Sequence, residues 1–331
     1  MGKRPTSHDV ARRAGVSQTT VSFVFTGRSG ISAATRERVL AAAAELNYRP
    51  NLAARSMRTH RTGRLAVVIP VSGLNLFPVL EGAAATARDA GYVVEVISLS
   101  SSPEERADDL ASVAESGEYE GILSFTPIRA PQPTSTDSAP VLLSLSEFDE
   151  NMHATGAFSD ARPVAEIMEK LAELGHRRFL HIAGPPDYPA AVARRDLYLT
   201  TVERLGLDSL GVVGGDWSGL TANHCVQDLP DDTPPLAIIA ANDVLAAGAI
   251  RGAVSRGWTV PGDVSVTGWD DLIMSAHFIP SLTTVFQDRH RLGSSSMQRL
   301  LAAIRGTEPP AQEEALQKVV WRESVAAPRA R

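Results

Sequence analysis

The first 47 residues carry apolar positions at helical spacing in three short segments. Thr6 and Asp9 form the pattern of a capping box at the start of the first segment, and Gly15 predicts its end. Ser17 and Ser32 predict the caps of the second and third helices. The positions that we expect to turn toward one shared core are Val10, Ala11, Ala14, Val21, Val24, Phe25, Val39, Leu40, Ala43 and Leu46. The pattern therefore predicts a small unit of three helices.

From Arg64 onward the pattern changes to an alternation of strands and helices. Apolar runs typical of strands lie at 65–71, 92–99, 121–125, 141–145, 178–184, 236–241 and 263–268. The first of these is continuous, as expected for a strand that is buried on both faces. Helices between the runs are expected to end at Gly175, Gly206, Gly257 and Gly306. This rhythm predicts an α/β fold of doubly wound parallel sheets, and a chain of 331 residues predicts two lobes.

Charge is divided unevenly along the chain, which changes the picture given by the formal net charge of −6. Residues 1–64 hold twelve Lys and Arg against three Asp and Glu, whereas the remainder holds 20 basic and 35 acidic residues. A basic head on an acidic body indicates that the head alone meets a polyanion. The single cysteine, Cys225, excludes an internal disulfide and a cysteine-rich zinc site. Because no apolar run reaches the ~18 residues of a membrane helix and no signal-peptide pattern is present, we expect a cytoplasmic protein without membrane contact.

The first two predicted helices are separated by a three-residue turn, which suits a helix-turn-helix. In that motif the second helix points its outward side chains at base edges in the major groove, and here these are Gln18, Thr19, Ser22 and Phe23. Glutamine pairs with adenine through two hydrogen bonds, and a threonine methyl packs on a thymine methyl. A small bundle that binds a protein, or nothing, is the alternative; the positive charge favours DNA.

The run DVARRAGVSQTTVSFVFTGRSG and its continuation to Gly63 closely resemble the head of the lactose-repressor (LacI/GalR) family, nearly without gaps. The resemblance implies that Gln18 and Thr19 read bases in the major groove. It also implies that residues 51–57 are a hinge helix, which folds on DNA and enters the minor groove. The full set of residues expected at the DNA is Thr6, Ser17, Gln18, Thr19, Ser22, Phe23, Thr26, Asn51, Ala54, Arg55, Met57 and Arg58.

The chemistry of the hinge segment suits this role. Seven residues are too few for a stable isolated helix in water. Ala53 and Ala54 are small enough for two such helices to approach closely, and Arg55 and Arg58 can meet phosphates. Met57 stands where the family usually has leucine as a wedge between base pairs, and an apolar methionine can fill that role. The alternative is a flexible tether.

Two positions of the reading helix depart from the family pattern. Phe23 stands where arginine is usual, and Thr26 where asparagine is common. Phe23 has no hydrogen-bond donor, so we expect apolar contact with thymine methyls and an operator unlike the common one. Packing of Phe23 on neighbouring side chains is the alternative.

The rest of the chain resembles the periplasmic-binding-protein-like core of the same family. The segments that carry this resemblance are LAELGHRR (171–178), ANDVLAAGAIRGAVSRGWTVPGDVSVTGWDD (241–271) and PSLTTVFQD (280–288). Ligands of open α/β sheets lie at the carboxyl ends of strands, and the space between two lobes is the natural site. By resemblance the effector pocket holds Arg194, Trp217, Asn242 and Asp270, with Gln287 near the lobe crossover.

Simpler interpretations exist for several of these residues. Asn242 or Asp243 could cap the following helix, and Trp217 could be ordinary packing. Asp160 is a pocket carboxylate or an N-cap, and we favour the cap. In the first lobe Val71 and Leu74 stand where the family often has polar residues, so Leu74 would make the pocket wall less polar. The expected effector is thus a sugar or a less polar metabolite.

Enzyme motifs are absent from the sequence. There is no GxSxG, HExxH or Walker pattern, and GVVGGD (211–216) lacks the GxGxxG spacing. The eight histidines are scattered, and His176 is expected to be structural. We therefore expect no catalytic activity, no cofactor and no metal.

Three parts are expected: a helix-turn-helix domain at 1–50, a hinge helix and linker at 51–63, and an effector-binding and dimerisation domain at 64–331. Within the last, the N-lobe would comprise about 64–158 and 288–315, and the C-lobe about 159–287 and 316–326. The expected function is a repressor that binds a near-palindromic operator in double-stranded DNA as a homodimer, under control of a small-molecule effector held between the lobes. The alternatives are a constitutive or protein-regulated repressor and a solute-binding protein, which the basic head disfavours.

Overall fold

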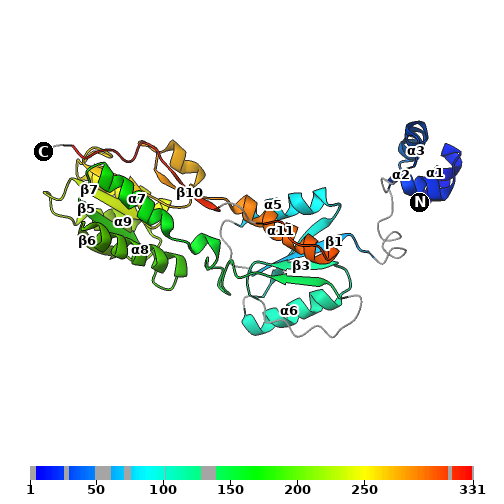
Figure 1. The fold of residues 1–331 in the computed structure, drawn as a ribbon, viewed down its shortest axis with the longest axis horizontal. Coiled ribbons are helices and arrows are strands. Elements are labelled where there is room, and N and C mark those ends of the chain that lie inside the picture. Colours follow the sequence, from blue (N-terminus) through cyan, green and yellow to red (C-terminus); the bar gives the residue numbers. More distant parts are fainter. Residues whose placement is uncertain are drawn as a thin grey trace. The chain divides into compact units, whose positions relative to one another are not determined.

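The computed structural model describes residues 5–25, 30–48, 61–70, 76–100, 102–127, 139–311 and 315–329. The chain separates into two compact units, residues 1–63 and 64–331 (Figure 1). Of the residues singled out in the sequence, Thr26, Asn51, Ala53, Ala54, Arg55, Met57, Arg58, Val71 and Leu74 lie outside the described ranges.

The first unit consists of three helices, α1 (Ser7–Ala14), α2 (Gln18–Phe25) and α3 (Ala33–Glu45). The capping box at α1 is confirmed: the Thr6 backbone N–H donates to Asp9 Oδ2 at 2.9 Å, and the Asp9 N–H donates back to Thr6 Oγ1. Gly15 ends α1 in the left-handed region at φ 65°, where a residue without Cβ is favoured. The local sequence thus sets both ends of this helix.

The core of this unit is small and aliphatic. Its buried members are Val10, Ala11, Val21, Val24, Val39, Ala42 and Ala43. Phe25 packs edge-to-face on Tyr48, with ring centroids 5.7 Å apart. The prediction for Leu40 was wrong, because its side chain is 45% exposed. In α3 the inward positions follow Val39 at i+3 and i+4, and Leu40 lies about 100° away from that face.

The second unit contains two parallel sheets with the same strand order. The first sheet runs β2-β1-β3-β4, and the second runs β6-β5-β7-β8. The strands are β1 (Arg64–Pro70), β2 (Val93–Leu99), β3 (Gly121–Ser124), β4 (Val141–Ser144), β5 (Arg178–Ala183), β6 (Asp208–Gly214), β7 (Leu236–Ala240) and β8 (Val264–Thr267). Strand β6 was not predicted, because it is an edge strand with two glycines and alternating partial exposure. The doubly wound α/β class is confirmed.

Helices cover both faces of the first sheet. They are α5 (Phe77–Asp89) and α11 (Arg289–Arg305) on one face and α6 (Pro103–Glu115) on the other (Figure 1). Along β1, Leu65 and Val67 enter the core beneath α5 and α11, whereas Ala66 and Val68 enter the core beneath α6. The continuous apolar run is explained by this burial on both faces.

The second sheet is also covered on both faces. Helices α9 (Gly219–Gln227) and α10 (Asp243–Ser255) enclose one core, and α7 (Arg162–Glu173) and α8 (Pro189–Leu205) enclose the other. Among the described residues, no helix is long and apolar enough to cross a bilayer.

The chain passes between the two lobes more than once. The segment after β4 leads through the short helix η1 (Ala157–Ser159) to α7. Strand β9 (Thr284–Gln287) leads back to α11, and it pairs antiparallel with β10 (Gln317–Val320). Residues after β10 then run beside β8, where the Val266 N–H donates to Ser324 O at 2.9 Å. The second lobe is therefore built from two separate stretches of the chain.

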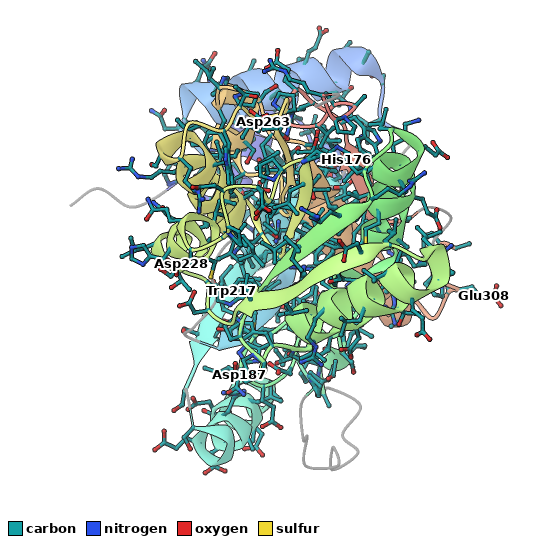
Figure 2. The ribbon with its side chains drawn as sticks, turned by 90° about the vertical axis from the view of Figure 1, so that its left-hand side faces the viewer. His176, Asp187, Trp217, Asp228, Asp263 and Glu308 are labelled. Atoms are coloured by element: carbon teal, nitrogen blue, oxygen red, sulfur yellow. The ribbon has the colours of Figure 1, made fainter. Side chains whose placement is uncertain are left out.

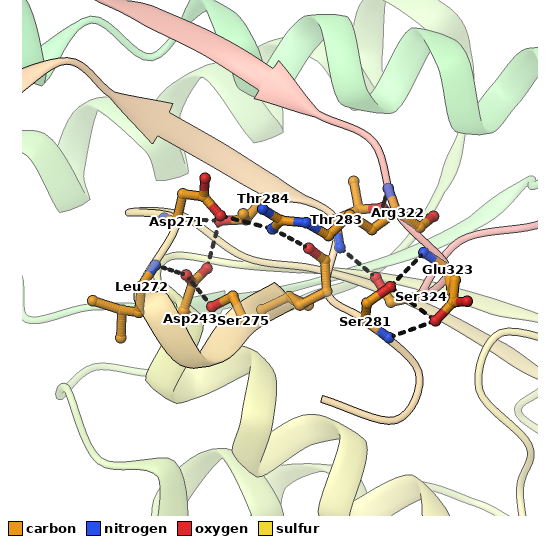
Figure 3. Close-up of polar contacts among 11 residues, drawn as sticks. Asp243, Asp271, Leu272, Ser275, Ser281, Thr283, Thr284, Arg322, Glu323 and Ser324 are labelled. Atoms are coloured by element: carbon orange, nitrogen blue, oxygen red, sulfur yellow. Dashed lines mark hydrogen bonds and ion pairs between the residues drawn. The ribbon is translucent and has the colours of Figure 1, made fainter. Parts of the chain in front are cut away.

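A buried polar network holds the end of the second sheet together near this crossing (Figure 3). Asp243 accepts three hydrogen bonds, from Leu272 N (2.8 Å), Ser275 Oγ (2.6 Å) and Thr284 Oγ1 (2.5 Å). Burial nevertheless raises the pKa of Asp243 to about 6. Arg322 forms an ion pair with Asp271 at 2.7 Å, which ties the β10 segment to the turn after β8.

Helices α5 and α11 approach each other through glycines. A Cβ atom on Gly293 would lie 1.8 Å from Val79 O, and one on Gly82 would lie 2.0 Å from His290 O. We expect Gly293→Ala to lower the free energy of unfolding of the second unit by about 2 kcal/mol, because the helices must move apart. The gain in helix propensity, about 1 kcal/mol, is already subtracted.

Thermal unfolding followed by circular dichroism checks this. The matched control is Gln298→Ala, an exposed position of the same helix, whose melting temperature should stay within about 1 °C of the parent. Equal melting temperatures for Gly293→Ala and the parent protein would show that the close helix contact is not needed.

Candidate nucleic-acid interface and ligand site

The outward face of α2 carries the residues expected to read DNA. Gln18 and Thr19 are exposed, while Ser22 and Phe23 are partly exposed. The Gln18 side chain donates from Nε2 to Ser7 Oγ at 2.8 Å, so α1 supports the residue that begins α2. Ser17 Oγ accepts the Thr20 N–H at 3.1 Å, which places this hydroxyl at the start of α2. The hydrogen bond between Gln18 and Ser7 thus holds the N-termini of α1 and α2 close together, beside the exposed polar face of α2.

Two of the three acidic residues of the first unit form ion pairs with arginines. Asp9 pairs with Arg12 at 2.6 Å, and Glu45 pairs with Arg13 at 2.7 Å. These pairs lie at the surface and contribute little to stability. The unit keeps a large surplus of positive charge, which suits contact with phosphates.

In the second unit, Arg194 of α8 is buried at the carboxyl end of the second sheet. Its Nη1 donates to the carbonyl oxygen of Ala241, the residue that follows β7, at 2.7 Å. The guanidinium carbon lies 4.1 Å from the centroid of the Trp269 ring, which suits a cation–π contact. Burial lowers the pKa of Arg194 to about 10, opposed by Asp270 and assisted by Arg289. The side chain remains cationic at neutral pH.

Asp270 lies directly beyond Trp269 in an unusual backbone conformation. Its φ is 108°, and its N–H donates to Val285 O at 3.0 Å. Its carboxylate meets Arg289 of α11, with Nη2 and Oδ1 3.2 Å apart. The Arg289 guanidinium also lies 5.6 Å from the centroid of the Phe158 ring in η1. Sequence reasoning missed Arg289; its place directly after the polar pair Gln287 and Asp288, at a strand-to-helix turn, was the available signal.

An aromatic group lies nearby on the second lobe. Trp217 follows β6 (Figure 2), and its ring packs edge-to-face on Tyr188 with centroids 5.4 Å apart. A Cβ on Gly184 would lie 2.2 Å from the Trp217 ring, so glycine is required at that position. His153, from the crossing after β4, packs on Tyr188 with ring centroids 3.9 Å apart and ring planes tilted by 33°. Trp217 therefore takes part in packing, and both Trp217 and Tyr188 remain partly exposed.

The remaining candidates have local roles. Asn242 caps α10, since its Oδ1 accepts the Leu245 N–H at 2.8 Å. Asp160 accepts the first N–H of α7, from Arg162, at 3.0 Å and pairs with the same residue's guanidinium. Gln287 is buried, and its Nε2 lies 3.5 Å from Phe158 O.

His176 also has a structural environment. Its Nε2 lies 3.0 Å from Ser265 Oγ and 2.9 Å from Ala326 O (Figure 2 labels the residue). Burial lowers the pKa of His176, which favours the neutral form of the ring. Within the described part of the chain, no group of three His, Cys, Asp or Glu is placed to hold a metal ion.

The structure thus connects Arg194, Asp270 and Gln287 through shared neighbours. Arg194 packs on Trp269, the residue before Asp270. Arg289 links the Asp270 carboxylate to the ring of Phe158, and Gln287 donates to the backbone oxygen of Phe158. Trp217 belongs to a second group with Tyr188, and the two groups are joined by α8, which carries Arg194. This combination of cationic donors, one carboxylate and aromatic rings can orient a small polar molecule with a flat or apolar part.

Comparison with known proteins agrees with this arrangement of parts. Residues 6–51 match the lacI family of bacterial regulatory proteins, and residues 168–325 match a periplasmic binding protein-like domain. The lactose operon repressor of Escherichia coli (strain K12) is 32% identical over 312 residues, which span 92% of this chain and 86% of that protein. The transcriptional repressor PurR of Proteus mirabilis (strain HI4320) is 31% identical over an alignment of 342 positions, gaps included, that covers 97% of both chains.

A solved structure extends the match to three dimensions. The crystal structure of the Lac repressor dimer, bound to operator and the anti-inducer ONPF, superposes with a TM-score of 0.69 at 27% identity. The match covers 98% of this chain and 100% of that one. The resemblance found in the sequence is confirmed, and the chain belongs to the lacI family of bacterial regulatory proteins.

Proposed function

We propose that this protein is a transcriptional repressor that binds a near-palindromic operator in double-stranded DNA as a homodimer, and that a small molecule held between the lobes of its body changes the operator affinity. The observation that carries this proposal is the outward polar face of α2, on a helix-turn-helix unit that holds the chain's surplus of positive charge. Its relatives named above are transcriptional repressors. We further propose that it acts in the cytoplasm and has no catalytic activity.

At the DNA, each residue has a role that follows from its chemistry. Gln18 and Thr19 would contact base edges, and Phe23 would meet thymine methyls. Thr6 and Ser17 lie at the starts of α1 and α2, where backbone N–H groups and the helix dipole favour a phosphate. The segment 51–63 would act as hinge and linker between a DNA-binding domain at 1–50 and a body at 64–331, with Asn51, Ala54, Arg55, Met57 and Arg58 at the minor groove.

In the body, Arg194 and Asp270 would fix polar groups of the effector, and Trp217 would stack on its ring. Asn242, Gln287 and Leu74 would complete the wall. Coupling of this kind between two sites is typically worth about 1–3 kcal/mol, or roughly 5–150-fold in affinity. The lobe boundaries proposed for this arrangement are about 64–158 and 288–315 for one lobe, and about 159–287 and 316–326 for the other.

The homodimer has a candidate surface on the second lobe. Large apolar side chains are exposed there, on α9, α10 and the short helix η2 (Ile273–His277) with the turn that follows it: Leu220, Val244, Ile273, Met274 and Ile279. Ile273 is 87% exposed and Ile279 is 96% exposed. Apolar exposure of this extent is typical of a protein interface. A second copy is the proposed occupant, since the Lac repressor structure that aligns with nearly the whole chain is a dimer.

We expect Gln18→Ala to weaken binding to a duplex selected from a random pool by roughly 5–150-fold, because one base contact of this kind is worth about 1–3 kcal/mol. The preference at one base position should relax as well. Titration of the full chain against the selected duplex, followed by a second selection with the variant, measures both. Lys170→Ala, on the exposed side of α7, is the control and should bind as the parent does. Unchanged affinity and selected sequence for Gln18→Ala would remove α2 as the reader.

Trp217→Leu is expected to reduce the response of operator binding to an active metabolite by about tenfold or more, because leucine keeps apolar packing but loses the stacked ring. Operator affinity without metabolite should stay unchanged. A panel of metabolites is screened for release or tightening of the operator complex, and the active compound is titrated. The matched control is Trp321→Leu, a tryptophan after β10 that is 40% exposed. An equal response in both variants would place the effector elsewhere.

A charge on the proposed dimer surface should separate the subunits. We expect Ile279→Glu to weaken dimerisation by about tenfold or more, because burying an unpaired carboxylate in an apolar interface costs more than about 1 kcal/mol. Sedimentation equilibrium of the full chain measures this. Leu199→Glu, which places the same charge at an exposed position of α8, should leave the dimer intact. Dimers of equal strength in both variants would contradict the assignment of this surface.

A further inference from the structure

The proposed effector site contains more positive than negative charge. Arg289 contacts the Asp270 carboxylate at 3.2 Å. The Arg194 guanidinium lies over the ring of Trp269, the residue before Asp270, with its central carbon 4.1 Å from the ring centroid, and it interacts with the Asp270 carboxylate electrostatically. The two guanidiniums also oppose each other, since Arg289 adds to the lowering of the Arg194 pKa. One carboxylate is therefore shared by two cations.

Other carboxylates close by are already committed to other partners. Asp243 receives three hydrogen bonds from η2 and β9, and Asp271 pairs with Arg322. Asp149 lies 3.1 Å from Nδ1 of His153, and Asp288 caps α11. None of these interactions offers a second counter-charge to Arg194 or Arg289.

Arg194 also has unused hydrogen-bonding capacity. A guanidinium has five N–H donors. Among the described residues, Arg194 donates one hydrogen bond, from Nη1 to Ala241 O. A buried cation with a shared counter-ion and few acceptors is unfavourable, and an anion that brings acceptor oxygens relieves both costs.

We propose that the effector is an organic anion whose carboxylate or phosphate group lies between Arg194 and Arg289, beside Asp270. This rests on the proposed effector site. Guanidiniums bind both kinds of oxyanion through paired, charge-assisted hydrogen bonds. The apolar or ring part of the molecule lies against Trp217 and Tyr188, whose rings are partly exposed on the same lobe. Arg289 is then the residue that selects acidic over neutral molecules of the same shape.

The test uses three probes on the full chain: inorganic phosphate, glucuronate and neutral glucose, each titrated by calorimetry at constant ionic strength. We expect at least one of the two anions to bind, and we expect Arg289→Gln to weaken that binding about tenfold or more. Arg289→Lys should retain part of the affinity, because it keeps the charge but loses the planar fork. Phosphate binding without glucuronate binding assigns a phosphate ligand, and the reverse assigns a carboxylate.

Arg299→Gln is the matched control, since it removes an exposed arginine of the same helix, and it should bind the anions as the parent does. Absence of any anion binding that depends on Arg289 overturns the proposal. So does a neutral metabolite that changes operator affinity equally in the parent and in Arg289→Gln. Operator binding by the parent and by Trp217→Leu is measured on the same samples. Failure of the anions to bind would therefore overturn only this inference, because the repressor function is tested by operator binding itself.

Discussion

Parallel strand direction is the constraint on which the proposed effector site depends. Because β5, β6, β7 and β8 all run the same way, their carboxyl ends meet along one edge of the second sheet. Tyr188, Trp217, Ala241 and Asp270 each follow a different strand of this sheet within a few residues. The edge therefore gathers an aromatic pair, a backbone acceptor for Arg194 and a carboxylate without any of these residues being neighbours in the chain.

Crossing segments complete this edge with groups from outside the sheet. Phe158 in η1 and Arg289 at the start of α11 lie where the chain passes between the lobes, and both contact the Asp270 region. The network around Asp243 and the Asp271–Arg322 ion pair anchor β9 and the β10 segment beside it. A ligand held by Arg194, Asp270 and Arg289 would therefore act on side chains from α8, the second sheet and a crossing helix at once. Through these side chains, binding of the ligand could change the relative position of the two lobes.

Charge is sorted at two scales in this protein. At the scale of the chain, a basic helical unit suited to phosphates is joined to an acidic body, which favours contact of the helical unit alone with DNA. Inside the acidic body, the local surplus at Arg194 and Arg289 runs opposite to the net charge. A buried surplus of positive charge is unfavourable without a partner, so it points to an anionic ligand. The aromatic residues are weaker evidence for a ligand, because packing alone accounts for their positions.

Sequence alone was sufficient wherever short-range physics decides the outcome. Helix caps at Thr6, Ser17 and Ser32 depend on residues three positions apart, and the buried strands depend on continuous apolar runs, so both could be predicted. Leu40 was misplaced because Val39 and Leu40 are neighbouring apolar residues of one helix. Only the packing of the three helices decides which of the two faces the core. Strand β6 was missed because its edge position, rather than its composition, makes it a strand. The role of Arg289 could not be predicted, because it depends on contacts with Asp270 and Phe158, which are nineteen and 131 positions away in the sequence. Charge balance at a buried site is a property of three-dimensional proximity, and only the tertiary structure decides which charges share one counter-ion.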